Sequence, residues 1–305
     1  MDIRDIESQK EIFKGYTDNF ILSSTEDKIN GYIDKQNHSL FVLDEVVLIN
    51  SLFTNYNESF KNLLFLESLF HDIGRFEQLN ITGTFDDNKI KQYYPQMEDH
   101  GDLGATIIKE EKLLENLIPN IRIYDEEVRK VIKSHSKVNS DLLNSIIFDY
   151  IKVFKNYDLR ELFLSNNTEK EKIVLSATNT AIIQDVDRLD IFRKIVKGIW
   201  IPMTTDEAID PELFDLYRRG KLPSMNEIKK MGKWNANVGH LVRMSFINQM
   251  NLVPVLKKIR DEKLIDKIYE INGNEVVEPA YEYAKEVLDK TINSTEDGII
   301  VKRKK

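Results

Sequence analysis

Four of the five histidines in this sequence recur at long, similar intervals around a His-Asp pair. His71 and Asp72 are adjacent, His38 lies 33 residues before His71, His100 lies 29 residues after it, and His135 follows 35 residues later. The chain has no cysteine. Any metal must therefore be held by imidazole nitrogen and carboxylate oxygen, ligands that suit Mn²⁺, Fe, Zn²⁺ or Mg²⁺. An ion held in this way activates water and polarises a phosphoryl oxygen, so hydrolysis needs no side-chain nucleophile.

The His71-Asp72 pair is the compact kernel of the expected site. Neighbouring residues on a helix diverge by about 100°, but at a helix end both side chains can turn towards one ion. An aspartate has two oxygens and can bridge two ions, so the pair can serve one metal or two. Without a metal, an apolar helix that ends in an acid would be costly, because a buried charge needs a partner.

The order of these residues resembles the HD-domain superfamily of metal-dependent phosphohydrolases. In both, a histidine is followed some thirty residues later by a His-Asp pair and then by a distant aspartate. The string His71-Asp72-Ile73-Gly74 is similar to the form found in many members, and Asp187-Arg188-Leu189-x-x-x-Arg193 resembles the distal aspartate motif of several branches. The resemblance covers roughly residues 30–195.

The resemblance implies that His38, His71, Asp72 and Asp187 bind a first metal ion. Asp185 is the alternative to Asp187, and the Asp-Arg-Leu alignment favours Asp187. Asp185 would then be a hydrogen-bond partner of a ligand. The competing structural roles are a helix N-terminal cap for His38 and an ion pair with a neighbouring arginine for Asp187.

His100 and His135 occupy positions where the two-metal branches of the superfamily place further histidines. The resemblance implies that they complete a second metal site bridged by Asp72. The competing interpretations are an exposed histidine at a helix start for His100 and a favourable imidazolium at a helix C-terminus for His135. The fifth histidine, His240, has no counterpart in the pattern, and we expect it to pack in the core.

Three arginines are candidates for substrate binding. Arg75 follows the His-Asp pair closely, where related branches often carry a basic residue, and a guanidinium suits a phosphate oxygen and stabilises developing charge. The competing role for Arg75 is a structural ion pair with Glu77 or Asp99. Arg188 and Arg193 are the other two candidates for contact with a phosphate.

The predicted function is a metal-dependent phosphohydrolase that cleaves a phosphate ester or anhydride of a nucleotide or another small phosphorylated metabolite. A metal-bound hydroxide would attack phosphorus, with catalytic roles for Asp72 and Arg75 and with one or two divalent ions as cofactor. Two alternatives stay open. The chain could be a di-iron HD-type oxygenase, or a catalytically silent HD module that senses a nucleotide.

Helices must position these residues. The apolar spacing predicts an all-α fold, and the resemblance implies an HD-type helical bundle with additional C-terminal helices. Residues 58–71 place apolar side chains at helical spacing and include the mostly apolar run LLFLESLF, so we expect a central buried helix that ends near Gly74, followed by a loop over residues 80–95. Pro254 is expected in the first turn of its helix. The predicted helices are 38–55, 58–71, 98–116, 125–134, 140–155, 169–198, 211–219, 235–250, 252–271 and 276–292.

Composition agrees with a helical globular protein. Gly (12) and Pro (7) are scarce in 305 residues, which favours long helices over a turn-rich β-architecture. The formal charge of -8 argues against a nucleic-acid partner. No signal-peptide or transmembrane pattern is present, so we expect a cytoplasmic protein without a membrane partner. We expect one domain over residues 1–305, with an HD core at about 30–195 and a helical extension at about 205–295. Homo-oligomerisation is left open.

Overall fold

Helices form every regular element in the part of the chain that the computed structural model describes. That part comprises residues 5–51, 58–117, 124–137, 169–200 and 203–295, and it contains no β-strand. The all-α prediction is therefore confirmed. No helix within these ranges is long and apolar enough to cross a membrane.

The chain divides into two compact units. The first comprises Met1–Lys137 and Asp141–Gln184, and the second comprises Val138–Ser140 and Asp185–Lys305. The division falls inside one long helix, α11 (Glu169–Val196). The single domain expected over residues 1–305 stays a prediction.

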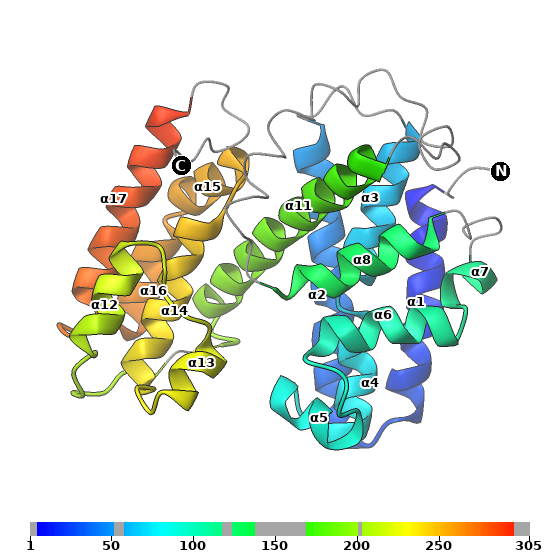
Figure 1. The fold of residues 1–305 in the computed structure, drawn as a ribbon, viewed down its shortest axis with the longest axis horizontal. Coiled ribbons are helices and arrows are strands. Elements are labelled where there is room, and N and C mark those ends of the chain that lie inside the picture. The colour runs from blue at the N-terminus through cyan, green and yellow to red at the C-terminus, as the bar shows by residue number, and fades with distance from the viewer. Residues whose placement is uncertain (1–4, 52–57, 118–123, 138–168, 201–202, 296–305) are drawn as a thin grey trace. The chain divides into compact units, whose positions relative to one another are not determined.

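The first unit is a bundle built around α2 and α3 (Figure 1). Helix α2 packs against α1, α3 and α4, and α6 packs against α4 and α8. Besides the first part of α11, the helices in the described part of this unit are α1 (Ile6–Ser23), α2 (Glu26–Asn50), α3 (Glu58–Phe70), α4 (Ile73–Thr82), η1 (Asp87–Lys89), α5 (Ile90–Tyr93), α6 (His100–Glu110), α7 (Leu113–Leu117) and α8 (Asp125–His135).

Aromatic side chains fix the packing of the first four helices. Phe13 of α1 meets Phe70 of α3 edge to face at 5.4 Å between ring centroids, and Tyr32 of α2 stacks on Phe76 of α4 at 6.1 Å. All four rings are at most 1% exposed. Such rings bury large apolar areas and prefer these offset and edge geometries. They hold α2, α3 and α4 together around the turn that carries the His-Asp pair.

The structure corrects the predicted role of Gly74. Helix α3 ends at Phe70, His71 and Asp72 form a turn, and Gly74 lies in the first turn of α4 instead of capping α3. A Cβ atom at Gly74 would lie 2.1 Å from the carbonyl oxygen of His100 and 2.6 Å from the nitrogen of Gly104. This glycine is therefore needed for the close approach of the α4 and α6 backbones.

The loop predicted over residues 80–95 is wrong in part. Helix α4 continues to Thr82 and ends at Gly83, whose φ of 68° is left-handed, and the short helices η1 and α5 follow. Elements of three or four residues are too short to show an apolar period. Two long predictions were also broken by residues with positive φ, 98–116 at Lys112 and 252–271 at Lys263.

The other helix boundaries predicted from the sequence agree with the structure to different degrees. The predictions for α3, α8, α11, α12, α14 and α17 hold within a few residues, whereas α2 begins well before the predicted start. Helices α1 and α13 were not predicted, and the predicted helix 140–155 lies outside the described residues.

Among the residues that the structure describes, the second unit contains the rest of α11 and six further helices. Helix α14 packs against α12 and α17, and α17 also packs against α15 and α16. Pro254 lies in the first turn of α15, as predicted. The helices are α12 (Pro211–Arg218), α13 (Met225–Lys230), α14 (Ala236–Gln249), α15 (Val253–Asp261), α16 (Leu264–Asn272) and α17 (Glu278–Ser294).

Candidate metal centre

The carboxylate of Asp72 lies between two pairs of histidines in the first unit. Its Oδ2 atom is 3.5 Å from His38 Nε2 and 4.0 Å from His71 Nε2. Its Oδ1 atom is 3.3 Å from His100 Nε2 and 3.5 Å from His135 Nε2. None of the five side chains belongs to a residue more than 6% exposed. The two oxygens of one buried carboxylate thus face separate pairs of imidazoles.

Helix ends and a turn deliver these side chains. His38 lies within α2, while His71 and Asp72 form the turn between α3 and α4. His100 is the first residue of α6, and His135 is the last residue of α8. The packing of α4 against α6 and of α6 against α8 brings these ends together. The sequence-based expectation that a helix end would let both members of the His-Asp pair turn inward agrees with this arrangement.

The spacing of the ligand atoms fits bound ions. Two groups, one of His38, His71 and Asp72 and one of Asp72, His100 and His135, each place one ligand atom per residue within 4.8 Å of the others. The Nε2 atoms are 3.2 Å apart in the first pair of histidines and 3.1 Å apart in the second. Ligands about 2.1 Å from a metal are about 3.0 Å apart in octahedral and about 3.4 Å apart in tetrahedral geometry.

Hydrogen bonds on the far side of the rings set the tautomers. His71 Nδ1 lies 2.7 Å from the carbonyl oxygen of Ser68, and His135 Nδ1 lies 2.6 Å from that of Ile132. A carbonyl oxygen only accepts, so each Nδ1 carries the proton and each Nε2 presents its lone pair inward. His100 Nδ1 faces a carboxylate in the same way. His100 Nε2 and His135 Nε2 then direct lone pairs at each other across 3.1 Å. Such lone pairs repel unless a cation lies between them, so this pair of donors fits a divalent ion.

The charges around Asp72 keep it ionised. Burial alone would raise the pKa of Asp72, but the ammonium of Lys35 and the facing imidazoles hold that pKa well below its usual range. Lys35 Nζ lies 2.9 Å from Asp72 Oδ2 and is buried with it. Lys35 was not predicted from the sequence, where its only signal is its place one helical turn before His38. The low pKa favours the carboxylate form of Asp72, which is the form that binds a metal ion.

Arg75 lies on the other side of the same carboxylate. Its Nη1 atom donates to Gln78 Oε1 at 2.7 Å, to the Phe85 carbonyl oxygen at 2.9 Å and to Asp87 Oδ1 at 2.9 Å. Its Nε atom is buried, has no hydrogen-bond partner among the described residues, and lies 3.8 Å from Asp72 Oδ1. One edge of the guanidinium is thus anchored while Nε remains for another acceptor.

Asp87 is a further acid at the centre that the sequence analysis missed. Its two carboxylate oxygens lie 3.1 and 3.2 Å from His100 Nδ1. Burial acts to raise the pKa of Asp87, but His100 and Arg75 outweigh it and lower the pKa to about 2. Burial and the nearby charge of Arg75 oppose the imidazolium form of His100, yet the carboxylates of Asp72 and Asp87 raise the pKa of that ring. Asp87 stands in the segment expected to be a loop, where no periodicity marked it.

The distal aspartates belong to the second unit. Asp185 is fully buried, and its Oδ2 atom accepts hydrogen bonds from the backbone nitrogens of Asn251 at 2.6 Å and Leu252 at 2.7 Å. It thereby anchors the start of α15 to α11. Asp187 is half-buried, and neither three-residue group includes it. Its role as a ligand stays a prediction.

Each of the two remaining arginines has a protein partner within the second unit. Arg188 Nη2 donates to Gln249 Oε1 at 3.0 Å, and Arg193 forms a two-point ion pair with Glu262. Their assignment to substrate binding stays a prediction. His240 is fully buried between Tyr281 Oη at 2.6 Å and the Met203 carbonyl oxygen at 3.2 Å, which agrees with its expected core packing.

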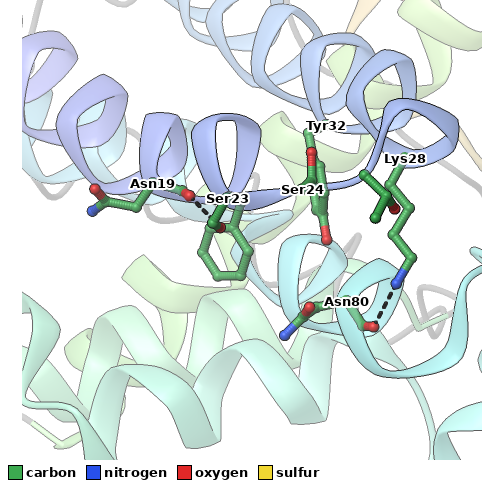
Figure 2. Close-up of a pocket in the computed structure, with 8 residues that line it drawn as sticks. Asn19, Ser23, Ser24, Lys28, Tyr32 and Asn80 are labelled. Carbon is green, nitrogen blue, oxygen red and sulfur yellow. Dashed lines mark hydrogen bonds between the residues drawn. The ribbon is translucent and has the colours of Figure 1, made fainter.

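A cavity of about 300 Å³ opens where α1 meets α2 (Figure 2). Lys28 Nζ donates there to the carbonyl oxygen of Asn80, and Ser23 Oγ donates to that of Asn19. None of the predicted site residues lines this cavity. It does not form part of the metal centre.

Comparison with known proteins gives one result. The family model described as HD domain matches residues 36–191, just over half of the chain, and the match includes His38, the His-Asp pair, His100, His135 and both distal aspartates. Neither a curated protein nor a solved structure gives a significant match.

Proposed function

This chain belongs to the HD domain family, and from that premise we propose that it is a metal-dependent phosphohydrolase. Its substrate would be a phosphate ester or anhydride of a nucleotide or another small phosphorylated metabolite. The observation that carries the proposal is the pair of buried ligand groups that share the carboxylate of Asp72.

The two groups would hold one or two divalent ions. His38, His71 and Asp72 would hold the first, with Asp187 as the further predicted ligand, and Asp72, His100 and His135 would hold the second. Mn²⁺, Fe, Zn²⁺ and Mg²⁺ all accept such oxygen and nitrogen ligands, with imidazole favouring the transition metals. Bound ions of this kind supply an activated water and neutralise charge on a phosphoryl oxygen.

The protein's own cations prepare the site for an anion. Lys35 lies 2.9 Å from one oxygen of Asp72, and Arg75 Nε lies 3.8 Å from the other. Since Arg75 Nη1 is held by three acceptors, the guanidinium cannot swing away, and Nε stays directed at the centre. A fixed donor in a buried site stabilises developing negative charge without reorganisation. Arg75 would therefore hold an oxygen of the transferred phosphoryl group.

Phosphate release from a panel of nucleotides and phosphomonoesters, with Mn²⁺, Fe²⁺ or Mg²⁺, tests this proposal. We expect release by the wild-type protein and none by Asp72→Ala. Asp289→Ala is the matched control, because Asp289 is an exposed acid on α17. If metal-loaded protein releases no phosphate from any substrate, the hydrolase proposal is wrong. Oxygen consumption by the iron-loaded protein would then favour the oxygenase alternative.

A further inference from the structure

His100 is held differently from His71 and His135. His71 donates from Nδ1 to the carbonyl oxygen of Ser68 near the end of α3, and His135 donates from Nδ1 to that of Ile132 in its own helix, α8. His100 is the first residue of α6, so no preceding turn of that helix supplies a carbonyl oxygen. Its Nδ1 instead meets the Asp87 carboxylate, thirteen residues away in sequence. The orientation of His100 thus depends on a side chain that can be substituted.

Asp87 is itself held on several sides. Arg75 Nη1 donates to Asp87 Oδ1 at 2.9 Å, and Gln78 Nε2 donates to the same oxygen at 3.2 Å. Its backbone belongs to the short helix η1, which Asp86 caps by accepting from the Asn88 nitrogen at 3.1 Å. The carboxylate therefore offers a fixed acceptor rather than a mobile one.

Asp87 acts on the centre only through the imidazole. It faces Nδ1, whereas the Nε2 atom of the same ring faces Asp72 at 3.3 Å and His135 Nε2 at 3.1 Å. Neither group of candidate ligands includes Asp87. A carboxylate that accepts from the distal nitrogen of a ligand histidine fixes the tautomer, orients the ring and makes the metal-facing nitrogen more basic.

We propose that Asp87 is a positioning residue that fixes the tautomer and orientation of His100 and thereby sets the affinity of the second ion position, formed by Asp72, His100 and His135. This inference rests on the metal centre of the proposed function, but not on the reaction. Without Asp87 the His100 proton can move to Nε2, and a protonated Nε2 cannot bind a metal. The position of His38 and His71 has no such dependence on Asp87.

Manganese titration of the metal-free full chain, followed by calorimetry and electron paramagnetic resonance, tests the proposal. We expect the wild-type protein to bind two ions, and Asp87→Ala to bind the first normally and the second about 10–100-fold more weakly. Asp87→Asn keeps an acceptor oxygen and should recover part of the loss. Asp86→Ala is the matched control, because it removes the cap of η1 without touching His100.

A second measurement needs no metal. The ¹⁵N shifts of the His100 ring in the metal-free protein should report a proton on Nδ1 in the wild type and in Asp86→Ala, and a mixture of tautomers in Asp87→Ala. Unchanged shifts and unchanged second-ion affinity in Asp87→Ala would overturn the proposal. So would an equal loss of both ions, an equal effect of Asp86→Ala, or a wild-type protein that binds fewer than two ions.

The two proposals can fail separately. The wild-type protein could bind two ions, and Asp87→Ala could weaken the second, while no phosphate is released. That result would contradict the hydrolase proposal and leave the positioning role of Asp87 intact. Wild-type protein that hydrolyses a phosphate and whose Asp87→Ala variant keeps both ions at normal affinity contradicts the role of Asp87 alone.

Discussion

Replacing Gly74 by alanine should separate two helices at the metal centre. The added Cβ would lie 2.1 Å from the carbonyl oxygen of His100, whereas ordinary contacts begin at 3.4 Å. The α4 and α6 backbones would have to part by more than 1 Å, because no side-chain rotation can relieve a contact with backbone atoms. Overpacking of this kind costs about 3 kcal/mol. The higher helix propensity of alanine offsets at most about 1 kcal/mol of this cost, so we expect a net destabilisation of about 2 kcal/mol.

Urea denaturation of Gly74→Ala beside Gly15→Ala measures this effect. Gly15 lies in α1, and a Cβ atom there would meet nothing within 4 Å. The same substitution should therefore stabilise the protein by about 0.5–1 kcal/mol at Gly15. Because His100 begins α6, Gly74→Ala should also weaken the second ion position. Equal stability and equal metal affinity in the two variants would refute the argument that α4 and α6 must approach closely at this glycine.

Three further predictions concern charge and metal. Burial lowers the pKa of His240 from 6.5 to about 4. The free energy of unfolding should therefore decrease by roughly 3 kcal/mol as the pH falls through this range. Urea titrations should show this decrease in the wild type and not in His240→Asn. Burial raises the pKa of Glu67 well above 4.5, so the free energy of unfolding should fall as the pH rises above that value. Glu67→Gln keeps an acceptor for Asn179 and should make the free energy of unfolding less dependent on pH. Mn²⁺ at 100 times its Kd should raise the free energy of unfolding by about 2.7 kcal/mol per ion, an effect that a chelator removes and that Asp72→Ala lacks.

The ligand residues could be predicted because residue type and order carry the signal. Few structural roles require histidines, a His-Asp pair and a distal aspartate at such long intervals. The structure brings five of these side chains together around the Asp72 carboxylate. The central helix could also be predicted, since a helical segment so rich in leucine and phenylalanine must be buried. Its residues Phe60, Leu63 and Leu64 are fully buried.

The residues that support the ligands could not be predicted in this way. Lys35 and Asp87 are ordinary charged residues in sequence, and most such side chains are simply solvated. Their roles depend on where tertiary packing brings α2 and η1, which local periodicity does not encode. Gly74 was misplaced for a similar reason. A glycine after an apolar helix fits a C-terminal cap equally well, and only the approach of α6 distinguishes the two roles.

Counting the ions bound per chain tests the central claim most directly. Wild-type protein, metal-depleted and then reconstituted with Mn²⁺, should carry two ions per chain after gel filtration. His38→Ala and His135→Ala should each lose one ion from a different position, and Asp72→Ala should lose both because its carboxylate serves the two groups. A protein in which Asp72→Ala retains both ions, while remaining folded, would contradict the shared metal centre proposed for this chain.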